Sequence, residues 1–148
     1  MTLLNVVTVV CIGLLVGTEF AVSAFVNPVL WKLDGHARAG AVRMLARDLG
    51  FVMPIWYAGS FVFMIVETIV RWHSPAVTML IVAGAIWAAV IVLTLVFLVP
   101  INNQMARIEP DAWTEQTLRE HRKWDARHRF RIAALAASWV CLLLAIQV

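Results

Sequence analysis

The chain has 148 residues, of which 62% are hydrophobic and 14% are charged, and its formal net charge is +3. A soluble domain of this length carries far more charge, so the composition excludes soluble globular proteins and indicates a single integral membrane domain, residues 1–148. We expect the lipid bilayer to be its main partner and expect no binding to nucleic acid.

Four apolar stretches follow one another along the chain, at about 3–26, 51–70, 76–99 and 130–147. About 20 residues are needed to cross the hydrocarbon core, and in lipid only helices satisfy their own backbone polar groups within one segment. The first stretch is expected to end at Asn27-Pro28. The predicted fold is therefore all-α, an integral membrane four-helix bundle.

The three connections between these stretches differ in length and character. In the first, a turn at 33–35 is followed by a predicted amphipathic helix, 36–49, that lies on the membrane surface. The second, 71–75, is a tight turn that makes its two helices antiparallel neighbours. In the third, a helix is expected to begin near Ala112 with Asp111 as its N-cap. It then continues into the fourth span, which gives that span a long amphipathic cytoplasmic extension.

Basic residues predict the orientation in the membrane. Eleven of the twelve Lys and Arg residues lie in or beside the first and third connections, and only Arg71 lies in the second. The positive-inside rule places the two long basic connections in the cytoplasm and the N-terminus and C-terminus outside. The expected location is the plasma membrane or an inner membrane.

Glu19 is a carboxylate well inside the first apolar stretch, where burial of a lone charge is costly. An ionisable residue in a membrane helix is a functional candidate when a partner can be named. At 1.5 Å per residue, Glu19 lies about 12 Å below the cytoplasmic end of its helix. The alternative is that Glu19 is protonated or paired with arginine and serves packing alone.

Polar residues of the third and fourth spans are expected at the same depth as Glu19. Asn102 and Asn103 follow Pro100 at the end of the third span. On the fourth helix, at about 100° per residue, one face carries an aromatic, imidazole and guanidinium set: His121, Trp124, Asp125, His128 and Arg131. These groups predict one shared pocket near the inner leaflet.

Each of these features also has a simpler explanation. The two asparagines after Pro100 would serve to end a helix, and the basic face around His121 would bind anionic lipid. Trp56 and Trp124 would then belong to an interfacial aromatic belt.

Two further patterns concern packing. Glu67 and Arg71, spaced i and i+4, are interpreted as a helix-surface pair. Gly13 and Gly17 form a small-xxx-small pattern, which predicts close contact with another helix.

The sequence resembles the anthrone oxygenase-like family of small four-span membrane proteins, and the resemblance covers nearly the whole chain. The matching segments appear in order: Gly17-Thr18-Glu19-Phe20, Asn27-Pro28, Val99-Pro100-Ile101-Asn102-Asn103-Gln104, and Arg122-Lys123-Trp124-Asp125-Ala126-Arg127-His128 leading into Arg131. The resemblance implies oxidation of anthrones to anthraquinones, with no organic cofactor established. Many members have no assigned activity.

The resulting hypothesis is an oxygenase for a hydrophobic, anthrone-like aromatic substrate that arrives from the bilayer. Glu19 or His128 would act as the general base, because burial and the chemistry of imidazole suit both to proton transfer. Asn103 and Arg131 would stabilise the enolate oxygen, with Asn102 beside them. The rings of Trp124 and Trp56 would stack on the substrate.

Three alternatives stay open at this stage. The first is a site for a transition metal, since nitrogen and carboxylate ligands suit iron or copper. The ligands would be Glu19, His121, Asp125 and His128. The second is an oxygenase reaction that needs no cofactor. The non-enzymatic alternative is a small membrane protein that binds a quinone, a lipid or a partner protein. The sequence also leaves open whether the chain forms a homo-oligomer.

Overall fold

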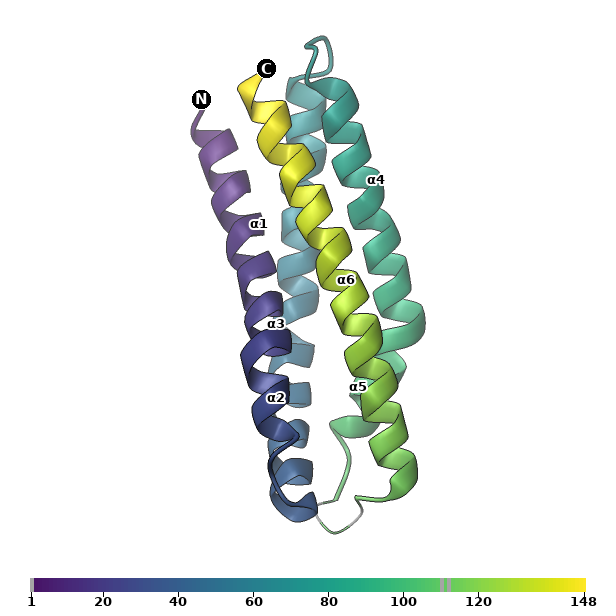
Figure 1. The fold of residues 1–148 in the computed structure, drawn as a ribbon. Coiled ribbons are helices and arrows are strands. Elements are labelled where there is room, and N and C mark those ends of the chain that lie inside the picture. The colour runs from purple at the N-terminus through teal and green to yellow at the C-terminus, as the bar shows by residue number, and fades with distance from the viewer. Residues whose placement is uncertain (1, 110, 112) are drawn as a thin grey trace.

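The computed structural model describes residues 2–109, 111 and 113–148, and its long elements within these ranges are all helices. Four helical rods, each long and apolar enough to cross a membrane, pack side by side: Leu3–Leu30, Gly35–Val70, Val77–Met105 and Glu115–Gln147 (Figure 1). The two chain ends and the short turn after Val70 lie at one end of the bundle, and the two longer connections lie at the other (Figure 1). The predicted all-α bundle is confirmed.

The first rod continues past the point where the sequence predicted its end. It consists of α1 (Leu3–Ala21), a π-helical turn η1 (Val22–Val26) and α2 (Asn27–Leu30). A proline inside a regular α-helix lacks an N–H donor and clashes with the carbonyl four residues earlier. The wider π turn directly before Asn27-Pro28 accommodates this proline, so the helix does not stop there.

The third rod repeats this arrangement. It consists of α4 (Val77–Leu93), a second π turn η2 (Thr94–Leu98) and α5 (Val99–Met105), with Pro100 directly after the π turn. π turns are rare and occur mostly as single insertions in α-helices, frequently at functional sites. Both of these turns lie in the half of the bundle that carries the longer connections (Figure 1).

The predicted surface helix 36–49 and the predicted span 51–70 are one uninterrupted helix, α3 (Gly35–Val70). Its N-cap is Asp34, whose side chain accepts a hydrogen bond from the backbone N–H of Ala37 at 2.9 Å. Val42 packs with Leu30 and with two α5 side chains rather than against lipid. The prediction of a separate surface helix is therefore wrong, because this segment continues without a break into the second span and packs at Val42 against protein.

The fourth rod is α6 (Glu115–Gln147), and it confirms that the fourth span has a long extension beyond the apolar stretch. Its predicted start is wrong. Thr114 is the N-cap and accepts from the backbone N–H of Thr117 at 3.3 Å, whereas the Asp111 carboxylate lies 3.0 Å from Nδ1 of His36. Ala112, where the helix was expected to begin, lies outside the described residues.

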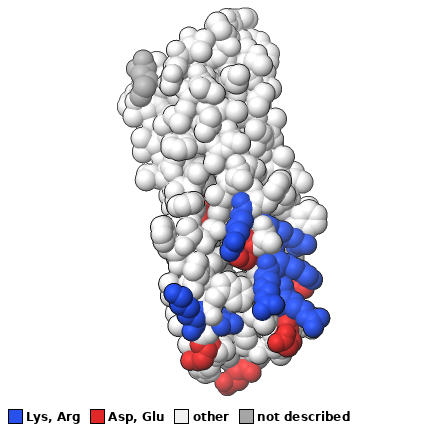
Figure 2. Space-filling model, viewed as in Figure 1, with Lys and Arg blue, Asp and Glu red and all other residues white. Residues whose placement is uncertain are grey.

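The surface divides into an apolar part and a charged part. On the face drawn in Figure 2, Lys, Arg, Asp and Glu gather toward the end with the long connections, and the rest of the face carries almost none. Large apolar side chains such as Ile55 and Ile69 are about two-thirds exposed, at 65% and 66%. This distribution suits a protein whose apolar part is surrounded by lipid. Which end faces the cytoplasm stays a prediction from the basic residues.

The predicted glycine contact holds for one of the two glycines. A Cβ atom added at Gly13 would lie 3.0 Å from the ring of Trp139 on α6, whereas one added at Gly17 would meet nothing within 4 Å. Gly13 thus allows α1 to approach α6 closely.

Substitution of these glycines separates packing from helix propensity. Gly13→Leu is expected to lower the free energy of unfolding by about 1–3 kcal/mol, because the added side chain overpacks against Trp139. Gly17→Leu, on the same helix, is the matched control and is expected to leave the stability unchanged or slightly raised. Thermal unfolding in detergent micelles measures both, and equal effects at the two positions would contradict the contact.

Candidate active site

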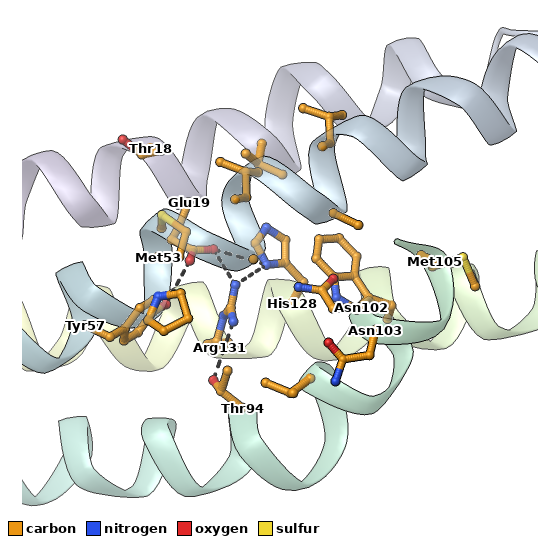
Figure 3. A pocket seen from close by; sticks show the side chains of 18 of the residues that line it. Thr18, Glu19, Met53, Tyr57, Thr94, Asn102, Asn103, Met105, His128 and Arg131 are labelled. Atoms are coloured by element: carbon orange, nitrogen blue, oxygen red, sulfur yellow. Dashed lines mark hydrogen bonds and ion pairs between the residues drawn. The ribbon is translucent and has the colours of Figure 1, made fainter. Parts of the chain in front are cut away.

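Glu19 is the centre of a buried polar cluster made by α1, α3 and α6 (Figure 3). Its side chain is only 3% exposed. The hydroxyl of Tyr57 donates to Oε1 at 2.9 Å, and Nη2 of Arg131 donates to Oε2 at 2.5 Å. The arginine compensates the carboxylate charge, so both oxygens of Glu19 are occupied.

His128 lies directly beside this ion pair and is 1% exposed. Its Nδ1 is 3.3 Å from Oε2 of Glu19 and 3.0 Å from Nη2 of Arg131. The indole of Trp124 stacks on the imidazole, with ring centroids 4.5 Å apart and planes at 15°. Nε2 is buried and has no hydrogen-bond partner among the described residues, which leaves it free for a ligand.

The contacts of Nδ1 are compatible with either neutral tautomer of His128. If Nδ1 keeps its hydrogen toward Glu19, Nε2 carries a lone pair and is a base. If Nδ1 accepts from the guanidinium of Arg131, which can only donate, Nε2 carries the hydrogen and is a donor. The same nitrogen can thus take a proton from a ligand or donate to its oxygen.

Arg131 is held from several sides. Its Nη1 is 3.5 Å from the hydroxyl of Thr94 on η2, and its guanidinium lies over the ring of Tyr57 at 5.5 Å from the centroid. Its Nε is buried without a partner among the described residues. The guanidinium is therefore fixed in orientation, and its Nε–H is unused.

The cluster forms one end of a cavity of about 340 Å³. Glu19, Tyr57, Thr94, His128 and Arg131 line that end, and the imidazole of His128 points into the space (Figure 3). Most of the remaining wall is apolar and includes Val22, Leu45, Met53, Ile91, Leu95 and Val99. A cavity that is mostly apolar and has a few convergent polar groups suits a hydrophobic ligand with a polar atom.

A second buried polar group lies one turn closer to the N-terminus of α6 than His128, around Asp125. The amide of Asn27 donates to Oδ1 of Asp125 at 2.8 Å, and Nη2 of Arg129 donates to Oδ2 at 2.9 Å. Asn27 lines the cavity, whereas Asp125 and Arg129 do not. This group connects α2 to α6 and holds the cavity wall in place.

Aromatic side chains close the end of the cavity nearest the long connections. His121 stacks on Trp31, with centroids 4.7 Å apart, and meets Trp113 edge to face at 5.9 Å. The guanidinium of Arg38 lies over both tryptophans. It also donates to three backbone carbonyls at the end of the first rod, those of Leu30, Trp31 and Leu33. The carbonyl of Leu30 also accepts from the backbone N–H of Leu33, and the last carbonyls of a helix generally lack an intrahelical partner.

Most of the residues predicted for the site lie at this cavity. Glu19, Asn102, Asn103, Trp124, His128 and Arg131 all line it. Trp56 does not, and the prediction that it contacts a substrate does not agree with its position. Its Nε1 donates to the backbone carbonyl of Cys11 at 3.2 Å, so it faces α1.

The four residues considered as metal ligands do not gather at one point. Glu19 and His128 are adjacent, but Asp125 is bonded to Asn27 and Arg129, and His121 is stacked on Trp31. Among the residues that the structure describes, no three His, Cys, Asp or Glu side chains are placed to hold a metal ion together.

Sequence reasoning missed Tyr57, Thr94 and Asn27. Tyr57 is the only tyrosine of the chain and lies within an apolar span, which was a usable signal. Thr94 is the one hydroxyl residue between Met79 and Val99, in a long apolar run. Asn27 was interpreted as a helix end because Pro28 follows it.

Glu67 is a second buried carboxylate, near the opposite end of the bundle. It is 1% exposed and accepts from Nδ2 of Asn5 at 3.0 and 2.9 Å and from Thr8 at 3.4 Å. Arg71 instead donates to the carbonyl of Ala145. The predicted Glu67–Arg71 surface pair is therefore wrong.

Fold and site together define a helical membrane protein with a buried carboxylate, guanidinium and imidazole at the end of an apolar cavity. Residues 42–141 match the family model described as anthrone oxygenase. Because this match covers more than half of the chain, the chain belongs to the anthrone oxygenase family. Tyr57, His128 and Arg131 lie within the matched residues, and Glu19 lies before them. No curated protein and no solved structure matched the chain.

Proposed function

We propose that this protein is a membrane oxygenase that oxidises a hydrophobic aromatic substrate with an acidic C–H group, such as an anthrone. One observation carries the proposal: Nε2 of His128 is buried, lacks a partner and belongs to a ring that lines the apolar cavity. Both oxygens of Glu19 are bonded to Tyr57 and Arg131. His128 is therefore the better general base of the two, and Glu19 is the residue that positions it.

The proposed reaction begins with transfer of the substrate C–H proton to Nε2 of His128. The imidazolium that forms donates Nδ1–H to Glu19, whose negative charge stabilises it. The carbanion, delocalised onto the substrate oxygen as an enolate, gives one electron to dioxygen. The two radicals combine to a peroxide anion, which takes the proton back from Nε2 of His128 to give a hydroperoxide. Loss of water from the hydroperoxide leaves a carbonyl, so a CH₂ group and O₂ become C=O and H₂O.

Side chains on the cavity wall are proposed to stabilise the enolate. The amides of Asn102 and Asn103 line the cavity, and Arg131 adds a positive charge with an unused Nε–H. Donors fixed in place before the reaction stabilise a developing oxyanion more than water does, because they need not reorient. Trp124 lines the same cavity and holds the imidazole plane by stacking.

The test compares the two buried carboxylates of the bundle. Purified protein in lipid nanodiscs is given anthrone, and oxygen uptake and product absorbance are followed. The wild type is expected to consume one O₂ per anthrone. Glu19→Gln is expected to lower the rate about 10- to 100-fold, since hydrogen bonds to charged groups contribute about 1.5–3 kcal/mol.

Glu67→Gln is the matched control, because Glu67 is equally buried but does not line the cavity. Its rate per folded molecule is expected to equal that of the wild type. Equal losses in both variants would indicate a general effect on the bundle rather than a role of the cluster. If the wild type consumes no oxygen with a series of anthrones, the oxygenase proposal is overturned in favour of a binding protein.

A further inference from the structure

We infer that the cavity opens sideways into the hydrocarbon layer, between α3 and the η2–α5 segment, and that substrate reaches His128 through this opening. The inference rests on the proposed function for the identity of the substrate. The opening itself is argued from the shape and chemistry of the cavity wall.

The α3 side of the opening is built from small residues. Ala46, Gly50, Pro54 and Ala58 are spaced by four and lie on one face of the helix, and all four line the cavity. Gly50, Pro54 and Ala58 are exposed as well. A residue that both lines a cavity and is exposed lies at its mouth.

Contacts on the other side of α3 show which way this face points. Trp56 and Glu67 bond to Cys11 and Asn5 of α1, so their side of the helix faces α1. At about 100° per residue, Pro54 and Ala58 lie about 160° around the helix from Trp56. Pro54 and Ala58 therefore face away from α1, on the side where α3 meets the third rod, and Gly50 lies about 120° around the helix from Trp56.

The opposite edge of the opening comes from η2 and α5. Leu95 and Val99 line the cavity, and Leu95 is 60% exposed. Exposed apolar side chains flank this edge, including Val92 at 60% and Val96 at 55%. The mouth therefore lies within the apolar surface that suits lipid, not within the charged end.

Beyond the mouth on either side, α3 is tied to its neighbours. On the side toward the chain termini, Nε1 of Trp87 on α4 donates to the backbone carbonyl of Tyr57 at 3.2 Å. On the other side, Trp31, Trp113 and His121 pack together with Arg38 over the tryptophans. Access from the aqueous end is thus obstructed, whereas the side toward lipid is lined by the smallest side chains.

The unpartnered nitrogen of His128, which also carries the proposed function, points to a ligand behind the opening. His128 is 1% exposed, and its ring points into the cavity behind the opening (Figure 3). A buried polar atom without a partner costs free energy unless a ligand or water satisfies it. The occupant that fits is a flat hydrophobic molecule with an oxygen near His128 and carbon surfaces against Met53, Leu95 and Val99.

Gly50→Phe tests the opening, and Gly59→Phe is its control. A Cβ atom added at either glycine meets nothing within 4 Å, so both variants are expected to fold. Only Gly50 lines the cavity. With anthrone in nanodiscs, Gly50→Phe is expected to lower kcat/KM about tenfold and to leave kcat at saturation unchanged. Gly59→Phe is expected to change neither.

A second measurement does not depend on oxygenase activity. A small aryl diazirine is dissolved in the lipid and photolysed, and the labelled residues are mapped by mass spectrometry. Labelling of Met53 in the cavity, relative to lipid-facing Ile69 on the same helix, is expected to fall at least threefold in Gly50→Phe and to be unchanged in Gly59→Phe.

The two measurements separate the two proposals. If Met53 is labelled equally in Gly50→Phe and the wild type, or not labelled in the wild type, the lateral opening is overturned even if anthrone is oxidised. If Gly50→Phe protects Met53 but no variant consumes oxygen, the opening is supported and the oxygenase function fails.

Discussion

Arg131→Met is expected to lower the free energy of unfolding by about 3–5 kcal/mol, because it leaves the buried Glu19 carboxylate without a cation. Arg131 donates to Oε2 of Glu19 at 2.5 Å, and no second Lys or Arg in the described residues bonds to that carboxylate. Oxygen consumption with anthrone is expected to be lost as well. Reversible unfolding in mixed micelles measures the stability.

The double variant Glu19→Gln/Arg131→Met shows whether the charge is the cause. Removing both charges is expected to restore most of the stability, since the neutral amide can still accept from Tyr57, while activity stays absent. Arg71→Met is the matched control: within the described residues the side chain of Arg71 bonds only to the carbonyl of Ala145, and its loss is expected to cost about 0.5–1.5 kcal/mol. A double variant no more stable than Arg131→Met would rule out charge compensation.

Variants of His128 are expected to lower the rate strongly while both members of the Glu19–Arg131 ion pair remain. Both His128→Gln and His128→Asn should reduce oxygen consumption about 10²- to 10⁴-fold, because neither amide can take up the substrate proton. The Gln amide reaches the position of Nε2 and the Asn amide that of Nδ1, so each keeps one hydrogen-bonding position. His73→Gln, in the exposed turn between α3 and α4, is the control and should keep the wild-type rate.

The pair of variants distinguishes a base from a simple donor. If His128→Gln keeps most of the activity, Nε2 serves only to donate a hydrogen bond, and the base lies elsewhere. Partial recovery of His128→Ala on addition of free imidazole would support the role as base. Circular dichroism and the unfolding temperature verify that each variant is folded.

The sequence was enough to predict that Glu19 of α1 lies at nearly the same depth in the bundle as His128 and Arg131 of α6. Helical periodicity places His128 and Arg131 on one face, and counting residues places Glu19 at a similar level, because rise and turn per residue are nearly constant in a helix. The structure brings the three together within hydrogen-bonding distance.

The rotation of α3 could not be predicted in the same way. Trp56 and Tyr57 are neighbours in a span that is apolar all round, so periodicity does not indicate which of them faces the cavity. Packing against α1 decides it, through the bond from Trp56 to Cys11. The prediction chose the larger indole and missed the hydroxyl that bonds to Glu19.

The ends of the first and third helical rods were also predicted wrongly, because of the prolines near them. Pro28 and Pro100 were both interpreted as marking helix ends, but a π turn before each lets the helix continue. The sequence carries no separate signal for a π turn, because its cost is offset by tertiary contacts. One such contact is the bond between Asn27 and Asp125.

These two π turns also bear on how the cavity can change in size. A π turn is a turn of α-helix with one residue inserted. If the insertion moves by one position along the helix, the residue that it passes rotates about the helix axis by about 100°. Both insertions lie in walls of the cavity, beside Val22 and Thr94, whereas α3 and α6 are continuous α-helices. A register change in either turn would therefore alter which side chain the wall presents to the binding space, and in η2 it would also move Thr94 away from the guanidinium of Arg131.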